Sequence, residues 1–268
     1  MCGPRTGSNM LVSALDSHPR IVCFREIFNF TFPDIDYAVQ GYRRDDPDAI
    51  ALRKRDPAAF LRTRIYAQNP AVVDAVGWKF IYEHFWDYPG LIEALQSDKA
   101  LRIIHLKRRN GLRAFLSYKM ALHTGRWQRP KRSRSRLGAR LASVARHPGR
   151  AAAALLGRAR EQVAESDRRI MLAPRECIEY IQMREKQMAH FEGLFSSHQR
   201  LDVQYEDLVT DRQGEFARAQ AFLGVEQKPL VEKVERQNPG TLRDLVQNYD
   251  ELASAITSAS YGWMLDEG

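Results

Sequence analysis

The residues best suited to chemistry lie at the start of the chain, in a loop of small residues that contains one arginine. The loop reads Cys2-Gly3-Pro4-Arg5-Thr6-Gly7-Ser8-Asn9, and an apolar segment with helical spacing follows it. A loop at a helix N-terminus offers unpaired backbone N–H groups and the positive end of the helix dipole to an anion. Gly3 and Gly7 allow a bound group to come close, and Arg5 supplies a guanidinium that grips phosphate. The pattern predicts a nucleotide phosphate site, although a simple turn and helix cap would use the same residues.

This loop differs from the common ATP- and GTP-binding loop. That motif, G-x-x-x-x-G-K-[ST], requires a lysine that reaches the outer phosphates. Here Ser8 and Asn9 follow Gly7, and the arginine precedes that glycine. A nucleotide kinase or NTPase is therefore an alternative rather than the first choice.

A second phosphate could be bound where a later apolar strand ends. Arg109 follows the expected strand at residues 101–106, and Ser117 lies eight residues further on, about two turns into the next helix. A guanidinium and a hydroxyl at that spacing suit a phosphate. The alternative is that Arg109 is a surface residue and that Ser117 merely continues the helix.

Short apolar strands alternate with helices along the chain. Besides the strand at 101–106, strands are expected at 20–24, 76–82 and 201–205, and helices at 57–68, 110–124, from Pro174, at 213–223 and at 241–257. This alternation predicts an α/β fold with a central parallel sheet flanked by helices. Ligands bind beyond the carboxyl ends of such strands, where the first loop and Arg109 both lie. Because only Met1 precedes Cys2, we expect the first strand to be truncated and its neighbours to lack a partner on one side.

Composition limits the class of protein. The 268 residues are consistent with a single domain, 1–268, that carries a basic insertion at about 129–170. No run approaches the roughly 18 apolar residues of a membrane span, and the three cysteines form no disulfide or zinc pattern. A reducing compartment, and so the cytoplasm, is expected.

The positive net charge of +8 is concentrated in one segment. Lys99 to Arg160 contains 18 Lys or Arg and no Asp or Glu, so acidic residues exceed basic ones elsewhere. Such a block attracts polyanions. For its insertion part, three interpretations stay open: a lid over an anionic acceptor, peripheral contact of residues 129–160 with an anionic membrane, or a solvated basic surface.

In order along the chain, these segments resemble the sulfotransferases that use 3′-phosphoadenosine 5′-phosphosulfate (PAPS). The Gly3–Ser8 loop resembles their 5′-phosphosulfate loop, and Arg109 and Ser117 match their 3′-phosphate residues in type and spacing. Further similar elements are Phe24–Phe28, Val76–Lys79, Ala121–Trp127, Val203–Leu208 and Ala221–Val225. The chain is most similar to the bacterial carbohydrate branch, which includes trehalose 2-sulfotransferase and the nodulation-factor sulfotransferases. The resemblance covers residue 2 to about 255, except roughly 129–170.

The resemblance implies a P-loop-like fold and a site for PAPS without a metal. Around the 5′ end of the donor we expect Arg5, Thr6, Gly7, Ser8 and Asn9. Around the 3′-phosphate we expect Arg109, Ser117 and, from a loop near the last helix, Arg243. The acceptor implied by this branch is a hydroxyl of a saccharide or glycolipid.

The resemblance also assigns catalytic roles. Glu26 would be the general base that removes the proton of the acceptor, with His84 as the alternative base, and Lys79 would contact the sulfate or the leaving oxygen beside Arg5. The competing structural interpretations are a surface ion pair of Glu26 with Arg25 and a strand-edge position for Lys79. Glu206 and Asp207 are expected to cap and orient the helix after their own strand.

Two further functional classes remain open beside the NTPase. The basic block could bind nucleic acid or another anionic surface, but its few aromatic residues (Phe115, Tyr118 and Trp127) argue against single-strand recognition, so no nucleic acid is expected. The chain could also be an inactive remnant, given its expected lack of a first strand. The oligomeric state is not indicated.

Overall fold

The computed structural model describes residues 1–29, 46–67, 72–88, 90–125, 127, 169–234 and 240–266. They form two compact units. The first comprises Met1–Ala114 and Tyr180–Lys233, and the second comprises Phe115–Glu179 and Val234–Gly268. The single domain predicted from the sequence stays a prediction, because its basic insertion falls almost wholly outside the described residues.

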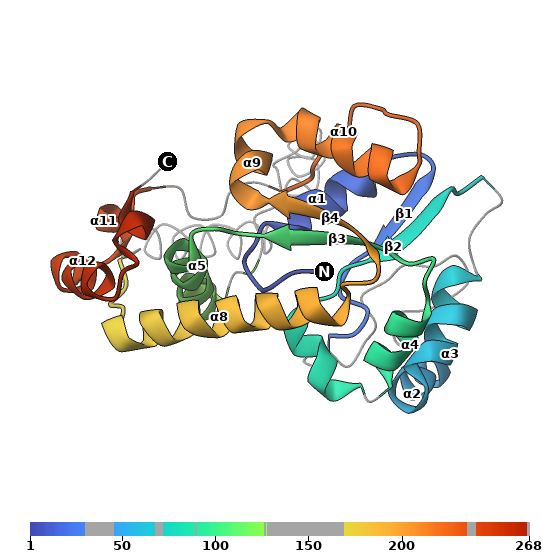
Figure 1. The fold of residues 1–268 in the computed structure, drawn as a ribbon, viewed down its shortest axis with the longest axis horizontal. Coiled ribbons are helices and arrows are strands. Elements are labelled where there is room, and N and C mark those ends of the chain that lie inside the picture. Colours follow the sequence, from blue (N-terminus) through green and yellow to red (C-terminus); the bar gives the residue numbers. More distant parts are fainter. Residues whose placement is uncertain are drawn as a thin grey trace, which may run out of the picture. The chain divides into compact units, whose positions relative to one another are not determined.

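The first unit contains the strands (Figure 1). They are β1 (Ile21–Phe24), β2 (Ala75–Trp78), β3 (Arg102–Lys107) and β4 (Gln199–Gln204). They form two parallel pairs, β1 with β2 and β3 with β4. Parallel strands that alternate with helices confirm the α/β class predicted from the sequence.

Met1 and Cys2 lie between the two pairs. Cys2 makes single parallel bridges with Ile81 on one side and Leu106 on the other. Its N–H donates to the Phe80 carbonyl at 2.9 Å, and the N–H of Leu106 donates to the Met1 carbonyl at 3.0 Å. Cys2 therefore joins the two pairs only through single bridges, and in the described part of the chain β2 and β3 pair with no strand on their other edges, as the sequence led us to expect.

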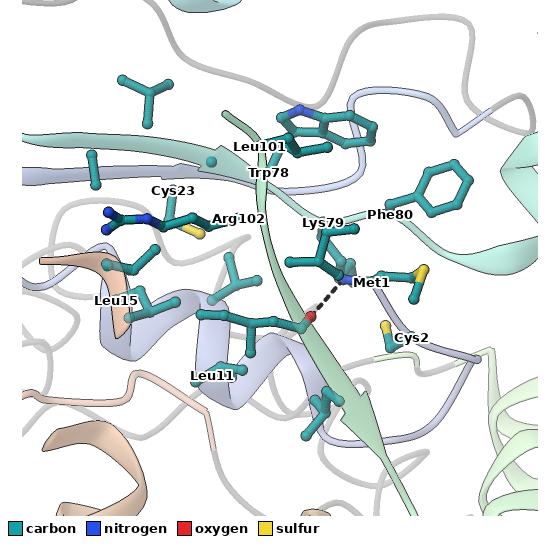
Figure 2. A pocket seen from close by; sticks show the side chains of 18 of the residues that line it. Met1, Cys2, Leu11, Leu15, Cys23, Trp78, Lys79, Phe80, Leu101 and Arg102 are labelled. Carbon is teal, nitrogen blue, oxygen red and sulfur yellow. Dashed lines mark hydrogen bonds between the residues drawn. The ribbon is translucent and has the colours of Figure 1, made fainter. Parts of the chain in front are cut away.

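A cavity of about 160 Å³ continues from this point between β2 and β3. Figure 2 shows Met1 among the residues that line it, with the amino group of Met1 bonded to the Ile104 carbonyl of β3. Burial lowers the pKa of this amino group. The lining is mainly apolar and includes Leu11, Leu15 and Leu101.

Alternate strand residues face two separate cores. Val22 and Phe24 contact the first core, and Ile21 and Cys23 contact the second. Because side chains alternate along a strand, helices are needed to cover both faces of the sheet. Residues of α2 (Pro47–Arg55), α3 (Pro57–Phe60) and α4 (Leu91–Ser97) enter the first core, and those of α1 (Ser8–Leu15), α9 (Tyr205–Thr210) and α10 (Arg212–Leu223) enter the second.

The helix predicted at 57–68 is present, but its second half is wider than an α-helix. The Asp56 side chain accepts from the Ala59 N–H at 2.8 Å, as its position before Pro57 predicted. From Leu61 to Tyr66 the chain forms a π-helix, η1. The sequence did not predict α2, which the side chain of Asp46 caps.

The strand predicted at 76–82 ends early, at Trp78. Beyond this residue, the Lys79 N–H bonds to the carbonyls of Phe24 and Arg25, and Phe80 and Tyr82 bond to Cys2 instead of continuing the ladder. A 3₁₀ helix, η2 (Tyr82–Asp87), follows. Because Phe80 and Tyr82 bond to Cys2 and not to β1, strand β2 ends at Trp78.

The second unit is helical in its described part. It takes in the continuation of α5 (Gly111–Thr124), the start of α8 (Pro174–Leu194), α11 (Leu242–Leu245), α12 (Tyr249–Ser258) and the 3₁₀ helix η3 (Gly262–Leu265). The single helix predicted at 241–257 was wrong, because Val246 bridges to Ile170 between α11 and α12. Among the described residues, every helix is too short or too polar to cross a membrane.

Candidate active site

The loop before α1 has the backbone geometry of an anion cradle. Arg5 has φ of +62° and Gly7 has φ of +85°. Residues in the left-handed region turn successive N–H groups toward one concave side, as in phosphate-binding loops. A non-glycine residue such as Arg5 adopts this conformation at a cost, which is typical of functional sites. Thr6 is fully buried, and its hydroxyl donates to the Gly3 carbonyl at 3.0 Å.

Two arginines that the sequence did not single out hold this loop from outside. Arg184 of α8 donates to the Pro4 carbonyl at 2.9 Å, and Arg108, just after β3, donates to the Arg5 carbonyl at 3.1 Å. Burial lowers the pKa of Arg108 to about 10 and also lowers the pKa of Arg5. Arg108 therefore remains charged at neutral pH. Arg108 and Arg184 fix two carbonyls of the loop.

Tyr205 at the start of α9 explains why position 7 is glycine. A Cβ atom at Gly7 would lie 2.5 Å from Cδ2 and 2.9 Å from Cε2 of the Tyr205 ring. The Arg108 guanidinium also packs against this ring, 4.3 Å from its centre. Any side chain at position 7 would therefore displace part of the loop or the ring.

Beside the loop, the structure brings Glu26, Lys79 and Asn9 together. Lys79 forms an ion pair with Glu26, and its ammonium donates to Asn9 Oδ1 at 2.7 Å. The Asn29 amide donates to Glu26 Oε2 at 2.6 Å, and His84 Nε2 lies 3.9 Å from the same oxygen. These residues meet because Glu26 follows β1 and Lys79 follows β2, whose carboxyl ends share one edge.

The charges of this cluster interact strongly. Burial raises the pKa of Glu26, but the opposing effects, led by the charge of Lys79 and its hydrogen bond, together bring that pKa below its usual value. Asn29 and His84 add smaller effects in the same direction. Burial lowers the pKa of His84 to about 4. At neutral pH Glu26 is therefore a carboxylate and His84 a neutral imidazole.

Arg109 lies at the surface in an ion pair. Its guanidinium pairs with Asp207, and its side chain is 54% exposed. The Glu206 carboxylate accepts from the backbone N–H groups of Arg109 and Asn110, at 3.1 and 3.2 Å. Glu206 therefore orients the segment before α5. This corrects the expectation that it caps the helix after its own strand, α9, which has no side-chain cap.

Ser117 and Arg243 belong to the second unit. Ser117 lies on α5. The Arg243 guanidinium lies 4.1 Å from the centre of the Tyr249 ring and 3.0 Å from Asp250 Oδ1. Their predicted contact with the donor, whose loop is in the first unit, stays a prediction.

One group of side chains has the composition of a metal site. The ligand atoms of His105, Glu192 and Asp202 lie within 4.8 Å of one another. The Lys107 ammonium pairs with both carboxylates, at 3.1 Å from Asp202 Oδ2. We therefore interpret the group as an ion-pair network around the buried His105. Burial lowers the pKa of His105 to about 3.

Comparison with known proteins identifies the family. The model of the sulfotransferase family matches residues 1–229. Nodulation protein H of Rhizobium tropici is 24% identical over 264 residues, which cover 96% of this chain and 88% of that protein. The crystal structure of a sulfotransferase from Alicyclobacillus acidocaldarius superposes with a TM-score of 0.49 and 18% identity, over 99% of this chain and 92% of the other. Since the family match covers most of its length, the chain belongs to the sulfotransferase family.

Proposed function

We propose that this protein transfers a sulfuryl group from PAPS to a hydroxyl group of a saccharide or glycolipid. The observation that carries the proposal is the Glu26–Lys79 pair, held beside an anion-binding loop at one edge of a parallel sheet. Family membership supports sulfuryl transfer. The choice of acceptor rests on the resemblance of the sequence to the bacterial carbohydrate branch.

The residues of the loop fit a donor of this kind. PAPS carries negative charge at both ends and supplies an activated sulfuryl group when bound. The N–H groups of Thr6, Gly7, Ser8 and Asn9 and the guanidinium of Arg5 would hold its 5′ end. Left-handed backbone at Arg5 and Gly7 supports this assignment, since it aims amides at an anion. We assign the 3′-phosphate to Arg109, Ser117 and Arg243 from the resemblance alone.

Sulfuryl transfer requires that the donor and the acceptor hydroxyl be aligned and that the charge on the leaving group be stabilised. Sulfuryl transfer resembles phosphoryl transfer, in which a loose transition state gains from in-line alignment and from cations near the leaving group. Glu26 would take the proton of the acceptor hydroxyl, a role worth about 10²–10⁴-fold in rate. Arg5 and Lys79 would stabilise the charge that develops on the leaving phosphate, so the reaction needs no metal in this scheme.

Further parts of the proposal concern location and partners. The free cysteines of the described residues are consistent with a reducing compartment, and we place the reaction in the cytoplasm. Because residues 129–160 are strongly basic, peripheral contact of this segment with an anionic membrane is the alternative location. These residues lie outside the part of the chain that the structure describes. We expect no nucleic-acid partner.

Calorimetric titration with 3′-phosphoadenosine 5′-phosphate, the desulfated product, tests the donor site. We expect micromolar binding that is lost in Arg109→Ala. No binding by folded wild-type protein would refute the donor assignment. Transfer of labelled sulfate to a panel of saccharides then tests the chemistry, with Glu26→Gln expected to lose at least 100-fold in kcat. Glu93→Gln, an exposed change on α4, is the matched control.

A further inference from the structure

Lys79 is placed between two regions of the candidate site. Its side chain is almost fully buried, and it follows β2 at the edge of the cavity (Figure 2). On one side its ammonium pairs with Glu26, the proposed base. On the other side it donates to Asn9, which lies in the first turn of α1 directly after the anion-binding loop. One ammonium can therefore reach both the base and the loop.

The two regions compete for this charge. Asn9 offers a neutral amide oxygen, which holds the ammonium in place without neutralising it. Glu26 offers a carboxylate, and a donor bound to the loop would bring a second anion close to Asn9. Because a buried ammonium is stabilised by the nearest anion, the more highly charged donor can displace the carboxylate.

Resting on the proposed function, we propose that Lys79 exchanges partners during the reaction. An anionic donor bound at Gly3–Asn9 draws the ammonium away from Glu26, and the released carboxylate then accepts the proton of the acceptor hydroxyl. The S–O bond to the 5′-phosphate breaks with its electron pair on that phosphate, beside Lys79. A new S–O bond forms to the acceptor oxygen, whose proton passes to Glu26. Donor binding thus prepares the base.

The surroundings of Glu26 determine what its release does. Lys79, His84 and Glu83 are titratable groups that interact with Glu26. Burial raises the pKa of Glu26, and the ion pair with Lys79 is the main opposing effect. His84 stays neutral near pH 7 because burial lowers its pKa to about 4. Loss of the ion pair therefore raises the pKa of Glu26 and makes it a stronger base.

Proton uptake on binding measures this exchange without any turnover. The probe is 3′-phosphoadenosine 5′-phosphate, titrated at about pH 5 in two buffers that differ in ionisation enthalpy. We expect wild-type protein to take up more protons per ligand than Glu26→Gln, by as much as one. The phosphates of the probe contribute in both proteins. Because the charge of Glu26 raises the pKa of His84, the comparison is repeated in a His84→Gln background, where the difference isolates Glu26.

Lys79→Met provides the second comparison. In this variant no ammonium can leave Glu26, so the uptake that depends on Glu26 should disappear although the probe still binds. If Lys79→Met fails to fold, as checked by thermal unfolding, Lys79→Gln replaces it. Equal proton numbers in wild type and Glu26→Gln would overturn the exchange and leave the proposed function intact. Failure of the probe to bind folded wild-type protein would refute the donor site, and the exchange with it.

Discussion

The contact between Gly7 and Tyr205 leads to a quantitative prediction for Gly7→Ala. Two separate costs add at this position. Left-handed backbone costs a residue with a Cβ about 1–2 kcal/mol, and Gly7 has φ of +85°. The new Cβ would also meet the Tyr205 ring at 2.5 Å, and overpacking of this kind costs about 1–3 kcal/mol. We expect a total loss of about 2–5 kcal/mol in the free energy of unfolding.

Gly90→Ala is the matched control for the first cost. Gly90 has φ of +79°, close to that of Gly7, and among the described residues no atom lies within 4 Å of the place that an added Cβ would take. It should therefore lose only about 1–2 kcal/mol. The reduced entropy of the unfolded chain is common to both variants and cancels in the comparison. The difference between them measures the contact with Tyr205.

Urea unfolding of both variants gives the two free energies, and calorimetry with 3′-phosphoadenosine 5′-phosphate gives the effect on the loop. We expect Gly7→Ala to weaken binding of this nucleotide as well, since the loop or the ring must move, whereas Gly90→Ala should not. Adding Tyr205→Ala to Gly7→Ala should recover part of the loss, because the three atoms nearest to the new Cβ all belong to this ring. The reasoning fails if Gly7→Ala is no less stable than Gly90→Ala.

Three other changes test the cavity, the support of the loop and the buried histidine. Gly77→Ala should stabilise the protein by about 0.5–1 kcal/mol in urea unfolding, because Gly77 lines the cavity and no described atom lies within 4 Å of the added methyl; a loss of stability would contradict this view. Arg184→Met removes the bond to the Pro4 carbonyl and should weaken nucleotide binding about 10- to 100-fold by calorimetry, whereas Arg175→Met, a 90% exposed change on the same helix, should leave it unchanged. Burial lowers the pKa of His84 to about 4, so its contribution to stability is complete above about pH 6.5 and is lost as the pH falls toward 4. Between pH 7 and 4.5 wild type should lose about 2–3 kcal/mol more than His84→Gln, and equal losses would exclude this effect.

Local signals in the sequence predicted the elements that local interactions determine. Asp56 before Pro57 marked the start of α3, and Pro174 marked the start of α8. Predictions failed where a distant partner decides the conformation. Residues after Trp78 leave the ladder to bond with Cys2, and Val246 is held by Ile170, so neither interruption has a signal in its own neighbourhood.

The same distinction applies to the candidate site. Glu26 follows the strand predicted at 20–24, and the resemblance to the sulfotransferases assigned roles to it and to Lys79. Lys79 was expected inside the strand at 76–82, so its place at the shared edge became visible only with the early end of β2 at Trp78. Arg108 stands in the same basic run as Arg109, but the sequence does not say which of the two turns toward the loop. Arg184 lies on a long polar helix and reaches Pro4 across 180 positions of sequence, which no local pattern encodes.

The position of Cys2 between the two strand pairs makes its thiol a natural reporter of opening. Cys2 and Cys177 are both buried, one in each unit, and burial raises the pKa of Cys177 to about 12. A thiol reagent can modify such groups only when the surrounding structure opens. Modification of Cys2 would record separation of the strand pairs, and modification of Cys177 would record loosening of the helical unit. Once Cys23→Ser has removed the third, only partly buried thiol, these two cysteines can show whether the two units open together or one at a time.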